Sequence, residues 1–388
     1  MRVAIVHYWL VGMRGGEKVL EALCELFPEA DIFTHVLVPD AISSTLRHHK
    51  ITTSWVARLP RARFWYKKYL PLMPIALEHL DLRDYDLVIS SESGPAKGVI
   101  PAPRSVHVCY CHSPMRYIWN MYHEYRASAG PIARFAMPLF AHYLRSWDVN
   151  SSARVDTFVA NSKNVAARIR RYYRRDAKVV PPPVNVDAFH PVAEQELGNH
   201  YLMVGELVRY KRPDLAVQAF NRSGRELVVI GGGEMLEQLR REAKANVKIL
   251  GPQPLHVLQF HYARCRALIF PGEEDFGIVP LEAMASGRPV VAFGCGGATE
   301  TVMDGRTGVL FQRQTVGGLL EGVERVEATA FDVETIVAHA RKFSEVRFKQ
   351  QMSQVIEAAL AGSRADEAAD PIEMIPEVPQ LATRAAYA

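Results

Sequence analysis

The stretch PGEEDFGIVPLEAMASG, residues 271–287, decides how the fold of this chain is interpreted. An apolar run over residues 267–270 precedes it and has the length of a buried strand. After Gly277 the pattern becomes helical, and Pro280 is well placed for a first helical turn. Loops between a strand and a helix bind ligands in open α/β sheets, and N–H groups at a helix start attract phosphate. A solvated acidic loop before an ordinary amphipathic helix is the structural alternative.

Composition indicates a soluble globular protein with two domains. The chain has 388 residues, of which 48% are hydrophobic and 23% charged, and its formal net charge of +4 is too small to indicate nucleic-acid binding. No window approaches the roughly 20 apolar residues that a membrane-spanning helix needs. Met1 to His7 is typical of a first strand and lacks the apolar core of a signal peptide.

The cysteines do not indicate a disulfide framework. There are five, an odd number in a long chain. Cys109 and Cys111 are separated by one residue, which is the wrong spacing for a zinc knuckle or a thioredoxin-type pair. We expect reduced, packed thiols in a cytoplasmic protein.

The first half of the chain alternates strands and helices. Val3 to Val6 is the predicted first strand, and a loop containing Gly15 and Gly16 precedes a helix predicted over residues 18–27. These glycines do not fit the dinucleotide spacing G-x-G-x-x-G. They either contact a ligand phosphate or allow a tight turn. Further strands are predicted at residues 31–37, 86–91, 106–111 and 155–160.

The pattern restarts after a stiff connector at residues 181–183, three consecutive prolines. This repetition predicts an α/β fold with two Rossmann-like, doubly wound domains facing a cleft, and a C-terminal helix closing back toward the N-terminal domain. The predicted parts are an N-terminal domain at 1–180, a C-terminal domain at 181–345, a closing helix at 346–362 and a loosely ordered tail at 363–388.

Basic and aromatic residues are interleaved from Arg58 to Leu77. Three prolines within this segment exclude one long helix. Such a composition suits an anionic membrane surface or a lipid-linked substrate. It suits equally a packed helical hairpin whose cations extend along apolar surface.

Taken together, these features resemble a known family, the retaining nucleotide-sugar glycosyltransferases of the GT-B fold, family 4 (glycosyl transferases group 1). The similarity extends from the first strand to about Leu360. Its most specific part is residues 274–285, EDFGIVPLEAMA, which is similar to the family's E-x7-E motif. Supporting similarity lies in Gly205 with Lys211, in Asn161 and Ser162, in Gly296 and Gly297 with Glu300, and in residues 304–308.

The resemblance implies a role for each matching residue. Glu274 would hydrogen-bond hydroxyl groups of the donor sugar, and Glu282 would hold the donor ribose. Lys211 would neutralise the diphosphate leaving group. His112 matches the N-terminal histidine that reaches toward the transferred sugar. The other expected donor contacts are Gly15, Gly16, Gly205, Gly251, Phe276, Gly277 and Ile278, the last three through backbone N–H groups.

One position departs from the family pattern. The family commonly has Arg directly after the glycine at position 205, but this chain has Glu206. We expect Arg209 to supply the second positive charge. Front-face displacement with retained configuration then needs no nucleophilic carboxylate, because fixed cations stabilise the departing diphosphate. No metal or other cofactor is expected, since Lys and Arg can neutralise the charge on the departing diphosphate.

Two further segments resemble one branch of this family, and this resemblance limits the expected substrates. The segments 110–117 and 63–82 resemble mannosyltransferases of bacterial O-antigen, capsule and exopolysaccharide assembly. This implies GDP-mannose as donor and an undecaprenyl-diphosphate-linked glycan as acceptor. The expected location is the cytoplasm, with peripheral contact of residues 58–77 at the inner face of the membrane. The alternatives are a nucleotide-sugar 2-epimerase, a glycogen-type phosphorylase, and a non-catalytic sugar-nucleotide-binding or scaffold protein.

Overall fold

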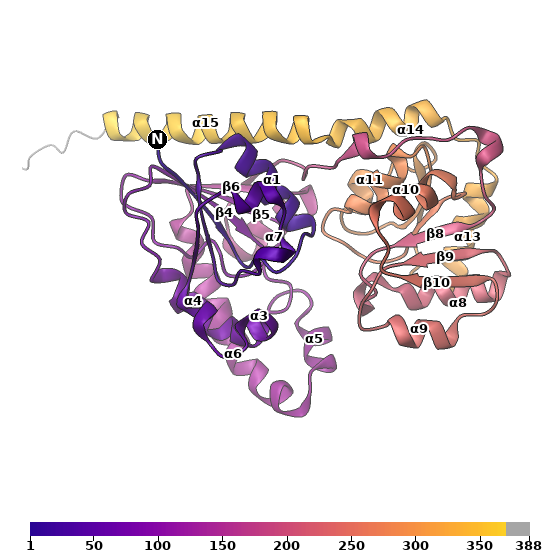
Figure 1. Ribbon diagram of the computed structural model, residues 1–388, viewed down its shortest axis with the longest axis horizontal. Helices are drawn as coiled ribbons and strands as arrows, with labels where there is room; N and C mark the ends of the chain where they lie inside the picture. Colours follow the sequence, from indigo (N-terminus) through magenta and orange to yellow (C-terminus); the bar gives the residue numbers. More distant parts are fainter. Residues whose placement is uncertain (370–388) are drawn as a thin grey trace, which may run out of the picture.

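The computed structural model describes residues 1–369, which form two α/β domains and a long C-terminal helix (Figure 1). The N-terminal sheet is parallel with strand order β3-β2-β1-β4-β5-β6-β7, and the C-terminal sheet is parallel with order β10-β9-β8-β11-β12-β13. The N-terminal strands are β1 (Val3–His7), β2 (Asp31–Thr34), β3 (Ile51–Thr53), β4 (Leu87–Glu92), β5 (Val106–Cys111), β6 (Thr157–Ala160) and β7 (Ala177–Val179). The C-terminal strands are β8 (Tyr201–Val204), β9 (Leu227–Ile230), β10 (Val247–Gly251), β11 (Leu268–Phe270), β12 (Val290–Phe293) and β13 (Gly308–Phe311).

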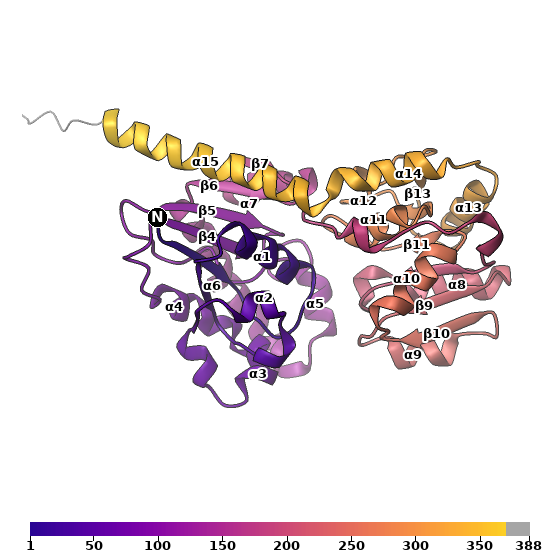
Figure 2. The same ribbon diagram turned by 45° about the horizontal axis from the view of Figure 1, so that its top comes forward.

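Helices cover both faces of each sheet, as parallel sheets require (Figures 1 and 2). Those of the N-terminal domain are α1 (Gly15–Leu26), α2 (Ser44–Arg47), α3 (Ala62–Trp65), α4 (Met73–Glu78), α5 (Tyr122–Ser128), α6 (Pro131–Ser151) and α7 (Lys163–Tyr173). Those of the C-terminal domain are α8 (Pro213–Ser223), α9 (Leu236–Glu242), α10 (Leu255–Arg264), α11 (Ile278–Ala285), α12 (Ala298–Thr301), α13 (Val316–Glu327) and α14 (Val333–Ala340). The last helix is α15 (Glu345–Ala369).

Each sheet has one point where the strand order reverses. In the N-terminal sheet it lies between β1 and β4, and in the C-terminal sheet between β8 and β11. Ligands of open α/β sheets bind beyond the carboxyl ends of the strands at such points. Each domain therefore has one such reversal point, and we expect the functional site to lie at these two points.

The closing helix joins the two domains as predicted (Figure 2). Phe348, Met352 and Ile356 of α15 are buried in the core of the N-terminal domain, and the Phe348 ring lies edge-on to Tyr110 at 5.6 Å. The predicted end of this helix at residue 362 is wrong, because α15 continues to Ala369. The helix pattern simply persists in an Ala- and Glu-rich sequence of high helix propensity. The remainder of the predicted tail, residues 370–388, lies outside the described residues.

Three other element boundaries differ from prediction by two residues or more. The helix predicted from residue 18 begins at Gly15, so Gly15 and Gly16 form its first turn and not a preceding loop. A capping box explains this early start, since the Glu17 carboxylate accepts the backbone N–H of Arg14 at 3.0 Å. The strand predicted over 31–37 ends at Thr34, and the one predicted over 155–160 begins at Thr157.

Prolines divide the basic and aromatic segment into short helices, as expected. It contains the end of the 3-10 helix η2 (Trp55–Arg58), α3, the 3-10 helix η3 (Tyr66–Leu72) and most of α4. Phe64 is 69% exposed, and Arg63 lies 4.9 Å from its ring centre. Within residues 1–369, no helix combines the length and apolarity needed to cross a bilayer.

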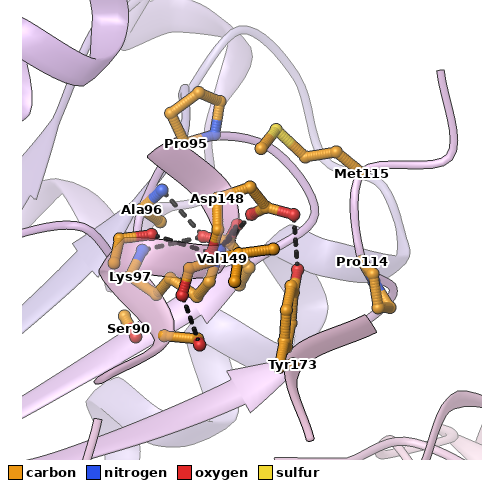
Figure 3. Close-up of polar contacts among 12 residues, drawn as sticks. Ser90, Pro95, Ala96, Lys97, Pro114, Met115, Asp148, Val149 and Tyr173 are labelled. Carbon is orange, nitrogen blue, oxygen red and sulfur yellow. Dashed lines mark hydrogen bonds and ion pairs between the residues drawn. The ribbon is translucent and has the colours of Figure 1, made fainter. Parts of the chain in front are cut away.

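A buried cluster of charges ties β4 and the loop that follows it to α6 (Figure 3). The Lys97 ammonium, with no exposed surface, pairs with Asp148 and lies 3.4 Å from Glu92 Oε1. The hydroxyl of Tyr173 donates to Asp148 at 2.9 Å (Figure 3). The indole N–H of Trp119 donates to the same carboxylate at 2.7 Å. Glu92 also accepts the backbone N–H groups of residues 96 and 97 at 2.7 and 2.8 Å. Full pairing compensates the cost of burying these charges and holds the carboxyl end of β4 in place.

Candidate functional site

The C-terminal half of the site lies at the β8/β11 reversal point. Lys211 follows β8, Glu274 follows β11, and Lys211 Nζ lies 2.9 Å from Glu274 Oε1. Burial alone would lower the pKa of Lys211, but the Glu274 carboxylate raises it above its usual value. The ammonium is therefore charged and held in place. A Cβ built on Gly205 would lie 3.5 Å from Lys211 Nζ, so this glycine borders the same space.

The start of α11 adds a second anion-attracting feature. Gly277 is its N-cap, with a left-handed φ of 99° that favours glycine. In the part of the chain that the structure describes, no side chain caps this helix, so the N–H groups after Gly277 and the positive end of the helix dipole are available to a ligand. Phe276, expected to contribute through its backbone, has its ring buried in the core 5.8 Å from Phe343.

Glu282 has a partner that the sequence did not reveal. The Tyr262 hydroxyl donates to Glu282 Oε2 at 2.7 Å. Burial raises the pKa of Glu282, while the bond from Tyr262 opposes the shift. Glu282 remains half-buried on the first turns of α11, and its predicted ribose contact stays a prediction. Gly251 ends β10 and accepts the backbone N–H of Gly231 at 3.0 Å.

The residue that departs from the family pattern makes a contact across the domains. Arg14 Nη1, in the N-terminal domain, lies 3.6 Å from Glu206 Oε2. Arg209 is 77% exposed, and its Nε lies 3.9 Å from Glu234 Oε1. Sequence reasoning overlooked Arg14, which brings a cation beside Glu206. The predicted role of Arg209 remains a prediction.

The N-terminal half lies at the β1/β4 reversal point. His7 and Ser91 are paired residues on these neighbouring strands, and their Nδ1 and Oγ atoms are 3.0 Å apart. His112 follows β5, and its Nε2 lies 2.8 Å from Ser91 Oγ. Gly16 packs directly on this end of β1, since a Cβ there would lie 2.5 Å from the Tyr8 hydroxyl. The sequence analysis singled out His112 but not His7 or Ser91, and the predicted role of His112 remains a prediction.

The two halves meet around one acidic residue. Asp275, beside Glu274, is paired with Arg168 and lies 3.4 Å from Arg116 of the N-terminal domain. Its carbonyl accepts the Ser162 hydroxyl at 2.6 Å. Arg116 also lies 5.0 Å from the ring centre of Tyr210, next to Lys211. A Cβ built on Gly15 would lie 3.2 Å from Ile278 Cδ1, so the starts of α1 and α11 face each other.

The residues at this interdomain site carry the charges needed to bind a diphosphate. Lys211, the start of α11 and Arg14 are positive, and Glu274 can accept hydrogen bonds from hydroxyl groups.

Within residues 1–369, no group of three or more His, Cys, Asp or Glu side chains could hold a metal ion. The expectation of reduced, packed cysteines agrees with the structure, in which all five are free and four are buried.

Comparison with family models gives two adjoining matches. Residues 13–188 match Glycosyltransferase Family 4, and residues 187–343 match Glycosyl transferases group 1. Together they span most of the chain, which belongs to this family of glycosyltransferases. The fold is also found in a solved structure: that of Anabaena Alr3699/HepE in complex with UDP matches with a TM-score of 0.66 at 17% identity, over 92% of this chain and 100% of that one.

Curated relatives are more similar in sequence but match over shorter lengths. The D-inositol 3-phosphate glycosyltransferase of Acidothermus cellulolyticus is 32% identical over 49% of this chain and 50% of that protein. A GDP-mannose-dependent alpha-(1-6)-phosphatidylinositol monomannoside mannosyltransferase of Mycolicibacterium smegmatis is 30% identical over 52% of this chain and 58% of that protein. The chain thus spans about half the length of the curated relatives it matches.

Proposed function

We propose that the protein is a retaining glycosyltransferase that moves a hexose from a nucleotide-diphosphate sugar to an acceptor hydroxyl. The observation that carries this proposal is the Lys211–Glu274 pair, 2.9 Å apart, beside the uncapped start of α11. A bound diphosphate would take over the Lys211 ammonium, which frees Glu274 to accept hydrogen bonds from sugar hydroxyl groups. One pair of residues would thereby hold both parts of the donor.

The proposed chemistry is a front-face displacement. The bond from the anomeric carbon to the diphosphate oxygen breaks while the acceptor oxygen bonds the same face of that carbon. The departing diphosphate takes the proton of the acceptor hydroxyl. Lys211 and the N–H groups of α11 stabilise the charge that develops on the leaving group. Glu274 orients the sugar without forming a covalent bond to it.

GDP-mannose is the donor we favour. The support is the M. smegmatis relative, whose name specifies GDP-mannose. The Anabaena neighbour is bound to UDP, but it shares only 17% identity. A thermal-shift panel of GDP, UDP and ADP separates these donors, followed by transfer assays with the matching sugar nucleotides. A UDP-specific shift would contradict the choice of GDP-mannose and leave glycosyl transfer intact.

For the acceptor we propose an undecaprenyl-diphosphate-linked glycan reached at a membrane surface. One face of α6, which sequence reasoning did not single out, is apolar and exposed: Ile132 is 88%, Phe135 89% and Leu139 73% exposed. Their spacing of three and four residues places them on one side of the helix. Helices α3 and α4, from the basic segment, lie at the same end of the N-terminal domain (Figures 1 and 2). Apolar side chains flanked by cations match a surface of anionic lipids.

Vesicle binding tests this surface. We expect cosedimentation with vesicles containing phosphatidylglycerol and much weaker binding to neutral phosphatidylcholine vesicles. Phe135→Glu should weaken binding, whereas Leu255→Glu, at a residue 53% exposed on the C-terminal domain, should not. Equal binding of all three proteins would contradict the membrane contact.

A GT-B epimerase is the main enzymatic alternative. An epimerase converts its nucleotide sugar without an acceptor, whereas a transferase releases nucleoside diphosphate in proportion to glycosylated acceptor. Incubation with donor alone and with donor plus lipid-linked acceptor therefore distinguishes the two. A bound sugar nucleotide with neither reaction, in the wild-type protein, would support a non-catalytic binding protein.

A further inference from the structure

We propose that a chain of three buried residues holds the proton of His112 on Nε2. The chain consists of Glu17, His7 and Ser91. It leaves Nδ1 of His112 as a hydrogen-bond acceptor toward the interdomain site, where it would receive a hydroxyl group of the donor sugar. The inference rests on the proposed function and adds three positioning residues to it.

Ser91 couples the two histidines. Its Oγ lies 3.0 Å from His7 Nδ1 and 2.8 Å from His112 Nε2. Ser91 and His7 are fully buried, so water does not complete their hydrogen bonds. A hydroxyl has one proton, which it donates to one imidazole nitrogen while it accepts from the other. The protonation of one histidine therefore dictates that of the other.

Glu17 determines which groups donate and which accept along this series of hydrogen bonds. Its Oε2 accepts the backbone N–H of Arg14 at 3.0 Å, and its Oε1 faces His7 Nε2 at 3.9 Å. Burial alone would raise the pKa of Glu17, but His7 and the backbone N–H of Arg14 lower it below its usual value. The carboxylate is thus ionised and can only accept. His7 Nε2 is buried and has no other partner among residues 1–369, so its N–H points toward this negative charge.

The distance between His7 Nε2 and Glu17 Oε1 is longer than that of a charge-assisted hydrogen bond. Charge-assisted hydrogen bonds are typically about 2.7–2.9 Å long, and 3.9 Å is too far to compensate a buried imidazolium. With its proton on Nε2, His7 accepts at Nδ1 from the Ser91 hydroxyl. Ser91 then accepts from His112, which must carry its proton on Nε2.

The remaining nitrogen of His112 is the one available to a ligand. Burial lowers the pKa of His112 to about 3, so the ring is neutral and carries one proton. Among residues 1–369, no group hydrogen-bonds Nδ1, and this atom is not one of the buried unpaired nitrogens. The half-buried ring therefore exposes Nδ1 beyond the carboxyl end of β5. A lone pair there accepts from a sugar hydroxyl, complementing the acceptor oxygens of Glu274.

NMR of the full-length protein with 15N-labelled histidine tests the proton position directly. We expect the wild-type His112 ring to show a protonated Nε2 and an unprotonated Nδ1. Ser91→Ala and Glu17→Gln should both change this into a mixture of tautomers. Ser91→Thr keeps a hydroxyl and should restore the wild-type pattern.

Ser90→Ala is the matched control. Ser90 is equally buried on the same strand and bonds His107 Nε2 at 2.8 Å, but His107 Nδ1 leads to the carbonyl of Arg154. We expect Ser91→Ala and Glu17→Gln to lower kcat/KM about 10- to 100-fold, as losses of orienting partners do, and Ser90→Ala to leave it unchanged. A wild-type His112 protonated on Nδ1, or a tautomer and rate that survive both variants, would overturn the proposal. The NMR result needs no donor, so it stands apart from any failure of the proposed transferase activity.

Discussion

Lys211 Nζ and Glu274 Oε1 lie 2.9 Å apart although the residues come from loops after two different strands, β8 and β11. Both side chains are mostly buried, at 17% and 20% exposure. In this geometry each side chain neutralises the charge of the other. The pair thereby compensates two charges that are largely removed from water.

Lys211→Met should abolish most donor turnover while the fold survives. Loss of one preorganised positive charge at a leaving group typically costs about 10²–10³ in kcat. Initial rates and calorimetric titration with GDP and guanosine measure this. We expect GDP affinity to fall and guanosine affinity to persist. Equal loss of both affinities would mean that Lys211 acts on the whole pocket and not on the diphosphate.

Two arginines compete for the role of the second cation. Arg209→Ala should lower donor turnover at least tenfold if the sequence-based expectation is right, because a second charge on the diphosphate would be missing. Arg14→Ala is the comparison, since Arg14 lies 3.6 Å from Glu206. Steady-state kinetics on both variants decides the assignment. Intact turnover in Arg209→Ala together with loss in Arg14→Ala would transfer the role to Arg14.

Lys97→Met should destabilise the N-terminal domain strongly. Removing one partner of a buried charge group leaves the others unpaired and typically costs about 3–5 kcal/mol of the free energy of unfolding. Urea unfolding measures this. Lys18→Met is the control, because its pair with Glu21 at 3.2 Å is on the surface and is worth about 0–1 kcal/mol. Similar stability of the two variants would show that Asp148 and Glu92 find other partners.

Glu300→Ala should loosen the contact between the domains. Glu300, in the C-terminal domain, accepts the backbone N–H groups of Lys163 and Asn164 at 2.8 and 2.9 Å. It thereby caps α7 of the N-terminal domain, a contact worth about 0.5–2 kcal/mol. Small-angle X-ray scattering should show a larger radius of gyration for Glu300→Ala than for the neighbouring Thr299→Ala. An unchanged radius would show that Asp275 and its arginines suffice.

Stability should decrease as pH falls from about 6.5 toward 4. Burial lowers the pKa of His35 and of His107 to about 4, whereas unfolded histidine titrates near 6.5. In this window the unfolded chain binds more protons, so the free energy of unfolding rises with pH, by up to about 1.4 kcal/mol per pH unit for each histidine. The raised pKa of Glu92 and of Glu282 opposes this trend.

Urea unfolding at pH 7, 6 and 5 measures the effect. His35→Gln removes one of the histidines with a lowered pKa and should flatten the dependence of stability on pH relative to wild type. A stability that increases on acidification over this range would mean that the carboxyl groups dominate.

Much of the fold could be predicted because it depends on local patterns. Short apolar runs ended by glycine or proline marked most strands, and the prolines at 181–183 lie between β7 and β8, which belong to different sheets. Element boundaries were harder to predict where a single side chain sets them and the hydrophobic pattern does not. The start of α1, set by the capping box of Glu17, is an example. The end of α15 was missed because high helix propensity continues past residue 362.

The sequence by itself determined the two α/β domains and the residues of the E-x7-E motif, since strand length, helix periodicity and motif spacing are properties of neighbouring residues. Only the tertiary structure decided which side chains from distant parts of the sequence lie in contact. The register of β1 against β4 places His7 beside Ser91, 84 positions away in the chain, and the turn after β5 adds His112. The approach of two domains sets Arg14 beside Glu206. Such contacts depend on strand pairing and domain packing, which leave no periodic signal in a single sequence.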